Sequence, residues 1–313
     1  MHFTFDGLLV LFCVLLSLGA ALWMALAMLL AWGMLRPPRM SAGKAIYHLR
    51  RLSPGDLGMG FEDQSFTVRD GRRGEKLSIA GWWIPASTPS ENCVVLLHGY
   101  ADAKVGAIVW APVFHDLNFN ILAIDLRAHG ESGGRYSTGG FFERDDVGQV
   151  IDQLLNVYPH HTRQVILFGA SLGAAIACAA AVDRDDISAV ILESPYADYE
   201  RAITAQVRMM GLPSGLLLKA AIAVAEWISG AKFDEVRPVD LLLKIKCPVL
   251  TIIGADDELL DGDDLRLLEQ ATTRDPSSIF WLVENTAHLQ AMATQPVEYE
   301  QRIGDFLAPA GQS

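Results

Sequence analysis

The hydrophobic positions of this 313-residue chain follow two different patterns. From Leu8 to Leu35 the chain runs for 28 positions without a charged residue. From about residue 60 onward, short apolar runs alternate with stretches of helical periodicity. The first pattern predicts one long apolar helix, and the second predicts a domain in which strands and helices alternate.

The apolar run is long enough to cross a membrane. A helix rises about 1.5 Å per residue, so about 20 residues span a bilayer core of roughly 30 Å. A buried core helix rarely has more than about 14 unbroken apolar residues, and a cleaved signal peptide has a basic segment before a shorter apolar stretch. Pro37 and Pro38 cannot continue the helix. We therefore expect a transmembrane anchor over residues 1–35, with residues 8–35 in the membrane, and a juxtamembrane linker over residues 36–60.

The charges on either side of the run predict its orientation. Asp6 precedes the run, and no acidic residue follows it until Asp56. Five basic residues lie in between: Arg36, Arg39, Lys44, Arg50 and Arg51. Because basic flanks stay in the cytoplasm, we expect a single-pass protein with its N-terminus outside and its main domain in the cytoplasm.

The second pattern predicts a mostly parallel sheet. A hairpin is expected first, and buried strands separated by helices follow it. The expected strands are residues 66–68, 77–84, 93–97, 120–125, 165–168, 189–192, 248–253 and 279–283. Ligands of such sheets bind beyond the carboxyl ends of the strands, so the residues directly after each strand are the candidates for function.

Ser171 is the candidate nucleophile. It stands in Gly169-Ala-Ser-Leu-Gly173, a G-x-S-x-G pattern placed between an apolar strand and an Ala-rich helix. Such a strand-to-helix turn exposes the hydroxyl at the positive end of the helix. A second match surrounds Ser132, but it lies in a Gly-rich loop that no helix follows directly. We interpret Ser132 as a turn residue.

A serine nucleophile needs a base, and the base needs a carboxylate. Of the eight histidines, His288 alone lies in the loop after the last strand. Asp257 follows the strand before it and is the preferred acid, while Asp256 and Glu193 remain alternatives. The backbone N–H groups of Leu172 and of Tyr100, which follows Gly99 after a central strand, are the candidates for an oxyanion hole.

The composition excludes several other classes of protein. The net charge of −12, from 25 basic and 37 acidic residues, disfavours nucleic-acid binding. The four cysteines, Cys13, Cys93, Cys178 and Cys247, form no CxxC pair and lie near no histidine cluster. We therefore expect neither a metal site nor a disulfide framework, and the proposed chemistry needs no cofactor.

The motifs and their order along the chain resemble those of the α/β-hydrolase superfamily, in its serine-hydrolase branch, over about residues 60–313. The matching segments are His98-Gly99, Asp125 to Ser132, Gly169 to Gly173, Gly254-x-x-Asp257 and His288. The last loop reads Thr286-Ala-His288, where the family more often has a glycine before the histidine. The resemblance implies an eight-stranded, mostly parallel sheet with helices on both faces and a Ser171–His288–Asp257 triad. It also implies a helical lid over about residues 196–240 of a hydrolase domain spanning residues 61–313; two core helices packed on the sheet are the alternative for this segment.

Together these features predict a membrane-anchored serine hydrolase. An apolar lid and an anchor suit an ester or thioester with a hydrophobic acyl part, cleaved through an acyl-enzyme. A peptidase or amidase of the same fold and a non-catalytic binding module are the alternatives, because a fold alone does not determine function.

Overall fold

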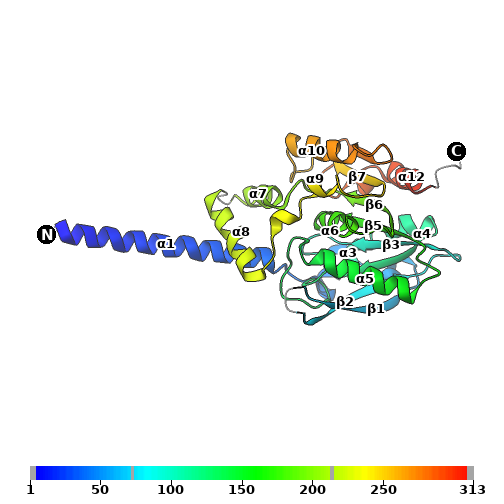
Figure 1. The fold of residues 1–313 in the computed structure, drawn as a ribbon, viewed down its shortest axis with the longest axis horizontal. Coiled ribbons are helices and arrows are strands. Elements are labelled where there is room, and N and C mark those ends of the chain that lie inside the picture. Colours follow the sequence, from blue (N-terminus) through cyan, green and yellow to red (C-terminus); the bar gives the residue numbers. More distant parts are fainter. Residues whose placement is uncertain (1–4, 72–73, 212–214, 309–313) are drawn as a thin grey trace.

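The computed structural model describes residues 5–71, 74–211 and 215–308. Residues 1–4 of the expected anchor, 72–73 of the expected hairpin turn, 212–214 of the expected lid and 309–313 of the expected domain lie outside the described residues. Within the described part, the chain forms one long N-terminal helix followed by an α/β domain (Figure 1).

The described residues form a sheet of eight strands, in the order β1-β2-β4-β3-β5-β6-β7-β8. The first two strands pair antiparallel with their neighbours, and the others pair in parallel. The strands are β1 Glu62–Arg69, β2 Lys76–Ile84, β3 Asn92–Leu97, β4 Asn120–Ile124, β5 Gln164–Ala170, β6 Ile187–Glu193, β7 Val249–Gly254 and β8 Ile279–Val283. The expected eight-stranded, mostly parallel sheet is confirmed.

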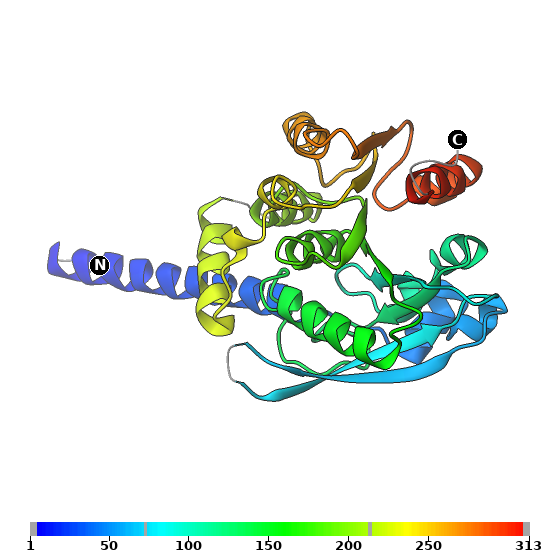
Figure 2. The ribbon, with the colours of Figure 1, turned by 45° about the vertical axis from the view of Figure 1, so that its right-hand side comes forward.

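Helices cover both faces of the sheet, as Figure 2 shows. After a first asparagine, the central strands β3 and β4 are apolar at every position, because alternate side chains enter the cores on the two faces. One face packs against α5 Glu143–Val157, α6 Leu172–Ala181 and α10 Gly262–Thr272. The other packs against α3 Lys104–Ala107, α4 Ala111–Asp116 and α12 Pro296–Leu307, with the short α11 Ala291–Thr294 before it.

One predicted helix is divided in the structure. The pattern over residues 103–117 indicates a single helix, but α3 ends at Ala107 and α4 begins at Ala111, with Pro112 in its first turn. Proline has no N–H to donate and is tolerated only in the first turn of a helix. Pro112 therefore starts the second helix and cannot continue the first.

Residues 36–60 contain α2 Ala42–Leu49 and the short helix η1 Pro54–Leu57. Ala45, Pro54 and Met59 are buried, and α2 packs against α3. This segment therefore contributes side chains to the core of the domain.

Helix α1 Phe5–Leu35 projects from the domain (Figure 1). Its segment Gly7–Leu35 is long and apolar enough to cross a membrane. The N-terminal part is exposed on all sides, whereas Ala27, Ala31, Met34 and Leu35 near its end are buried. Only the last part of α1 is therefore packed against the domain.

The segment between β6 and β7 leaves the sheet. It forms α7 Tyr199–Met209, α8 Leu216–Ser229, the short η2 Phe233–Glu235 and α9 Pro238–Leu241. Helix α8 lies across α1 and packs against its end, and α7 lies next to it (Figures 1 and 2). This insertion joins the long N-terminal helix to the carboxyl edge of the sheet.

Candidate active site

Ser171 occupies a strained turn between β5 and α6. Its φ of 53° and ψ of −113° lie in a region that side chains rarely adopt, which costs about 1–3 kcal/mol. Its backbone N–H donates to the carbonyl of Glu193 at 2.9 Å. A Cβ on Gly169 would collide with the backbone of Gly173, and a Cβ on Gly173 would collide with the carbonyl of Leu97. The two glycines of the motif are therefore required because α6 approaches the sheet so closely.

The structure brings Ser171, His288 and Asp257 together in one hydrogen-bonded series. His288 Nε2 lies 3.0 Å from Ser171 Oγ, and His288 Nδ1 lies 2.7 Å from Asp257 Oδ2. Because a carboxylate only accepts hydrogen bonds, Nδ1 carries the proton and Nε2 is free to accept the hydroxyl proton of Ser171. The Asp257 carboxylate is buried, whereas the imidazole is partly exposed to solvent.

Close backbone contacts hold the loops of Asp257 and His288 side by side. Asp256 N–H donates to the carbonyl of Thr286 at 2.9 Å. A Cβ on Gly254 would collide with the same carbonyl, so only glycine permits this approach. The loop geometry thus aligns the acid with the imidazole.

Two residues that the sequence analysis did not assign to the site position the His288 loop. The Glu258 carboxylate accepts the His288 N–H at 3.3 Å, and the Ser194 hydroxyl accepts the Leu289 N–H at 3.0 Å. Ser194 directly follows β6, at the sheet edge where the other candidates were found. Glu258 directly follows the candidate acid, and that adjacency is the signal that could have identified it.

The alternative acids do not face the imidazole. Asp256 is exposed, and its neighbour Asp257 makes the contact with His288. Glu193 is buried, and its carboxylate accepts the Tyr299 hydroxyl at 3.0 Å. Burial raises the pKa of Glu193 to about 8, so this side chain is a neutral acid at pH 7 rather than a counterion for an imidazolium.

The two candidate oxyanion donors lie beside Ser171. A Cβ placed on Gly99 would be 3.5 Å from the Cβ of Ser171, so the Gly99–Tyr100 peptide adjoins the nucleophile turn. Within the part of the chain that the structure describes, the N–H groups of Tyr100 and Leu172 have no hydrogen-bond acceptor. Two free donors next to a hydroxyl are what an oxyanion hole requires.

His98 orients the Gly99–Tyr100 peptide. Its Nδ1 lies 2.7 Å from the Gly99 carbonyl, and its Nε2 accepts the Leu126 N–H at 3.0 Å. Burial, together with neighbouring His129, lowers the pKa of His98 to about 3, so the ring stays neutral. With the Gly99 carbonyl held on one side, a trans peptide directs the Tyr100 N–H to the opposite side.

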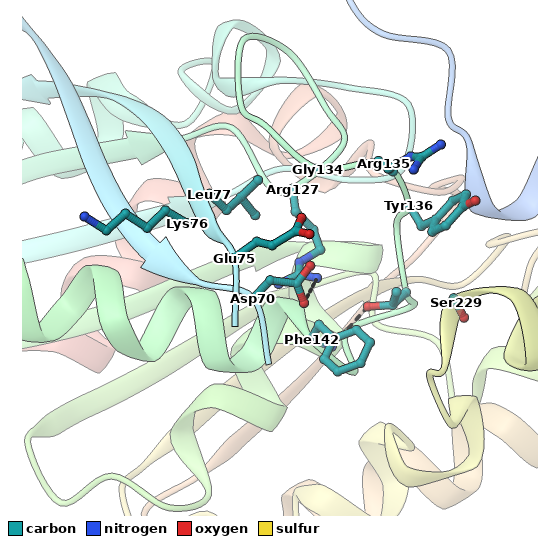
Figure 3. Close-up of a pocket in the computed structure, with 11 residues that line it drawn as sticks. Asp70, Glu75, Lys76, Leu77, Arg127, Gly134, Arg135, Tyr136, Phe142 and Ser229 are labelled. Atoms are coloured by element: carbon teal, nitrogen blue, oxygen red, sulfur yellow. Dashed lines mark hydrogen bonds and ion pairs between the residues drawn. The ribbon is translucent and has the colours of Figure 1, made fainter. Parts of the chain in front are cut away.

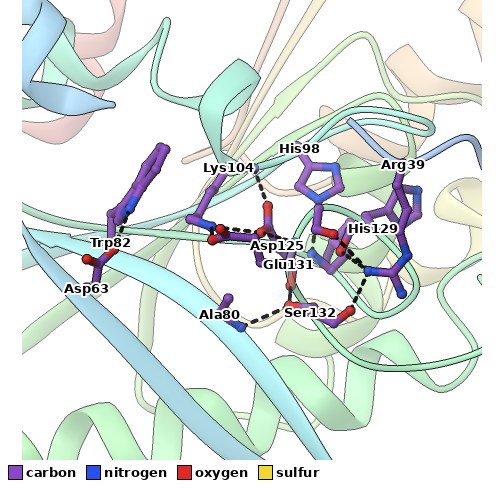
Figure 4. Close-up of polar contacts among 12 residues, drawn as sticks. Arg39, Asp63, Ala80, Trp82, His98, Lys104, Asp125, His129, Glu131 and Ser132 are labelled. Atoms are coloured by element: carbon purple, nitrogen blue, oxygen red, sulfur yellow. Dashed lines mark hydrogen bonds and ion pairs between the residues drawn. The ribbon is translucent and has the colours of Figure 1, made fainter. Parts of the chain in front are cut away.

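The second serine lies in a loop with a structural role (Figure 4). Ser132 Oγ donates to the Asp125 carbonyl at 2.6 Å and accepts the Ala80 N–H at 2.9 Å. Arg39, from the expected linker, donates to four carbonyls of the same loop, those of His129, Gly130, Ser132 and Gly134. The Ser132 hydroxyl is therefore already bonded to two backbone groups.

A buried ion pair supports this loop. The Asp125 carboxylate accepts from Lys104 Nζ at 2.9 Å and from the Glu131 N–H at 2.8 Å. Burial alone would raise the pKa of Asp125, but Lys104, His98 and these donors outweigh burial and lower it. Asp125 is thus held as a paired carboxylate.

Helix α1 reaches the site through Tyr100. The Tyr100 hydroxyl donates to the Gly33 carbonyl in the last turns of α1 at 2.6 Å. A separate cavity of about 250 Å³ is lined by residues that include Asp70, Arg127, Phe142 and Ser229 (Figure 3). Its lining does not include the candidate catalytic side chains.

No group of three or more His, Cys, Asp and Glu side chains that could hold a metal is found among the described residues. Cys93 and Cys178 are buried, and burial raises the pKa of both thiols. The candidate nucleophile, base and acid, Ser171, His288 and Asp257, are joined by hydrogen bonds between protein atoms.

The chain is similar to several known proteins. The family described as Serine aminopeptidase, S33 matches residues 88–233, which include Ser171 but end before Asp257. YfhR of Escherichia coli O157:H7 is 32% identical over 256 residues, covering 80% of this chain and 81% of YfhR. YqkD of Bacillus subtilis is 29% identical over 233 residues, covering 73% of this chain and 75% of YqkD.

Solved structures share the fold. The esterase Pf2001 of Pyrococcus furiosus is 25% identical to this chain and superposes with a TM-score of 0.71, over 88% of this chain and 97% of the esterase. The α/β hydrolase GrgF of a Penicillium species superposes with a TM-score of 0.59 at 18% identity, over 79% of this chain and 98% of GrgF. That second likeness concerns the fold alone.

Proposed function

Because this chain belongs to the α/β-hydrolase superfamily, within the family that contains YfhR, we propose that it is a membrane-anchored serine hydrolase cleaving a carboxylic ester or thioester. The observation that carries the proposal is the hydrogen-bonded series from Ser171 through His288 to Asp257. The backbone N–H groups of Tyr100 and Leu172 are the proposed oxyanion donors beside this series.

The mechanism follows from the geometry. His288 Nε2 takes the hydroxyl proton as Ser171 Oγ attacks the carbonyl carbon, and the two backbone N–H groups stabilise the oxyanion. The imidazolium, stabilised by Asp257, then gives its proton to the leaving alcohol or thiol as the acyl-enzyme forms. Water, deprotonated by His288, attacks the acyl-enzyme and releases the acid and Ser171.

The surroundings of the site favour a hydrophobic acyl group. Helix α8 has two ionisable residues, Lys219 and Glu226, in a stretch rich in Leu, Ala, Ile and Val. Tyr100 joins the site to the apolar helix α1. The likeness to an esterase structure supports ester substrates. We therefore place α7 and α8 as the lid of the site.

An amide substrate is the second candidate. The matching family is described as a serine aminopeptidase, and the same triad chemistry cleaves amides when the leaving amine is protonated by the imidazolium. A binding module without activity is the third outcome of the test below.

The anchor is proposed to remain part of the mature protein. Ala27, Ala31, Met34 and Leu35 of α1 are buried in the folded chain, so removing α1 as a signal peptide would expose the apolar surface that these side chains cover. The basic residues after α1 favour an orientation with the domain on the cytoplasmic side. A reporter fused to the C-terminus and active only in the cytoplasm supports this orientation, and one active only outside reverses it.

The function is tested with the purified full chain in detergent. We expect hydrolysis of p-nitrophenyl esters, rising with acyl length, and none of aminoacyl amides, with all activity lost in Ser171→Ala. Faster cleavage of amides would favour the peptidase, and inertness of a folded chain toward both classes would favour the binding module.

A further inference from the structure

The exposed part of α1 has the length of a bilayer core. From Gly7 to Leu26, 20 residues, no side chain that the structure describes is buried, and no charged residue occurs. At about 1.5 Å per residue this stretch rises about 30 Å. The protein begins to cover α1 at Ala27, so the folded domain starts where the hydrocarbon would end.

One face of α8 packs against the end of α1. Its buried positions are Leu218, Ala221, Ala225 and Ser229, spaced along a single helical face. The first three belong to one packed cluster with Ala31, Met34 and Leu35 of α1. Small side chains on both helices permit this close crossing. Helix α8 is therefore fixed across α1, beside the end of its uncovered stretch.

Another face of α8 is left exposed by the described residues, and it is mostly apolar. Leu216, Ala223 and Trp227 are exposed along it, with Lys219 as its one ionisable residue. Leu216 is 75% and Trp227 is 81% exposed, a large cost in water for such side chains. Apolar side chains with a tryptophan and a lysine are typical of a helix lying in a membrane interface.

The end of α7 continues the same surface. Met209 and Met210 are 59% and 65% exposed. In Figures 1 and 2, α8 lies across α1 next to its uncovered stretch, and α7 lies beside α8. Close by, the Arg36 guanidinium stacks 3.8 Å over the Trp32 ring, an amphipathic pair suited to the level of lipid headgroups.

The candidate active site is near the proposed level of the lipid headgroups. Tyr100 contacts Gly33, which lies seven residues, or about 10 Å, beyond Leu26 along α1. A groove of about 610 Å³, lined mostly by charged side chains, runs between Met209 on α7 and Glu258, whose carboxylate accepts the His288 N–H. The groove thus joins the exposed apolar end of α7 to the loop of the base.

We propose that α8 and the end of α7 rest in the interface of the same bilayer that α1 crosses. On the proposed hydrolase function, the substrate is then an ester resident in that bilayer, which reaches Ser171 from the lipid phase along α7. The occupant of the exposed face of α8 is the lipid itself, because α8 is packed against the end of the apolar helix α1, beside the stretch that has the length of a bilayer core.

The placement is tested by site-specific quenching in the full chain, reconstituted in phosphatidylcholine vesicles. A Trp227→Cys variant is made in a background with Cys13 and Cys247 replaced by serine and is labelled with an environment-sensitive fluorophore. The matched control is Val297→Cys, because Val297 is 77% exposed and its helix, α12, lies at the opposite end of the molecule from the exposed part of α1 (Figure 1). Circular dichroism checks that both variants are folded.

We expect lipids carrying a nitroxide close to the headgroup to quench the probe at position 227 and to leave the probe at 297 bright. Aqueous iodide should show the opposite preference. Equal quenching of both probes by iodide, with none by the labelled lipid at position 227, would overturn the proposal. The same measurement on Ser171→Ala keeps this result independent of any activity.

The substrate route is tested by Trp227→Glu, with Val297→Glu as its control. We expect Trp227→Glu to lower cleavage of a long-chain ester held in the vesicles about tenfold, and to lower cleavage of a soluble acetate ester much less. An equal effect of both variants, or no loss on the vesicle-bound ester, would contradict entry from the lipid. If the wild type cleaves neither ester, the proposed function fails, while the quenching result still decides the placement.

Discussion

Two loops at the same edge of the sheet contain the pattern G-x-S-x-G, and they use its serine differently. Ser171, after β5, adopts a strained backbone, and its hydroxyl faces the imidazole of His288. Ser132, after β4, is 2% exposed, and its hydroxyl is bonded to two backbone groups. The comparison teaches that the motif alone does not identify a nucleophile. What distinguishes the two serines is which groups the hydroxyl contacts.

The largest difference is expected in catalysis. Ser171→Ala should lower kcat by about 10⁶-fold, because the remaining groups have no nucleophile to activate. Ser132→Ala should leave kcat within about threefold, because Ser132 touches no reacting group. Ester hydrolysis by the two folded variants measures both effects, and comparable losses in the two would end the distinction between the loops.

The next effect distinguishes the two neighbouring aspartates. Asp257→Asn should lower kcat by about 10⁴-fold, since an amide can favour the wrong tautomer of His288 and cannot stabilise its cation. Exposed Asp256→Asn should change kcat little. Steady-state kinetics at saturating substrate decide this, and a larger loss from Asp256→Asn would move the acid to that residue.

Two buried acids near these loops, Glu193 and Asp125, should make the free energy of unfolding depend on pH in opposite directions. Burial raises the pKa of Glu193 to about 8 from an ordinary 4.5, so the folded chain keeps a proton that the unfolded chain loses. The free energy of unfolding should therefore fall as pH rises from about 4.5 to 8, by about 1.4 kcal/mol for each step of one in pH. Asp125, whose pKa is lowered, contributes stability above its unfolded pKa that is lost as pH falls through its folded pKa.

Urea unfolding of Glu193→Gln between pH 5 and 8 tests the first dependence. We expect a flatter pH profile than that of the wild type, because the amide has no proton to lose. Exposed Glu300→Gln is the control and should follow the wild type. Parallel profiles for wild type and Glu193→Gln would show that Glu193 is ionised in the folded chain.

The two serines should also differ in stability, by a smaller amount: replacing Ser132 should lower the free energy of unfolding more than replacing Ser171. Ser132→Ala leaves the Ala80 N–H and the Asp125 carbonyl without their buried partner, which should cost about 1–3 kcal/mol of unfolding free energy. Ser171→Ala breaks a contact in a partly exposed site and should cost less than about 1 kcal/mol. Urea unfolding compares them directly, and an equal cost would remove the structural role of Ser132.

The smallest expected effect concerns backbone strain. Ser171→Gly should raise the unfolding free energy by about 1 kcal/mol, because glycine relieves the strain at φ 53° but loses more entropy on folding. The positive-φ residues of the described chain do not include Ser132, so Ser132→Gly should only destabilise. A loss of stability in Ser171→Gly would show that the turn is relaxed.

Much of the sheet could be predicted because its strands are continuous apolar runs with turn residues between them. The positions of Ser171, Asp257 and His288 after three such strands also indicated a shared edge. Their contact depends on details such as the close approach of the Thr286 carbonyl to Gly254. A single sequence shows the glycine but not the backbone that packs against it.

The packing of α1 could not be predicted from the sequence. Its apolar composition indicates a membrane, and nothing in it distinguishes Ala27 and Ala31, which are buried, from the exposed residues before them. Arg39 is one of several basic flanking residues in the sequence, yet it binds four carbonyls of the Ser132 loop. Long-range partners of this kind follow from the fold and leave no local pattern.

The most direct measurement is to label the full chain with a serine-directed fluorophosphonate and to locate the adduct by mass spectrometry. We predict a single adduct on Ser171, no adduct in Ser171→Ala, and undiminished labelling in Ser132→Ala. An adduct on Ser132, or labelling that persists in Ser171→Ala, would contradict the assignment of the nucleophile.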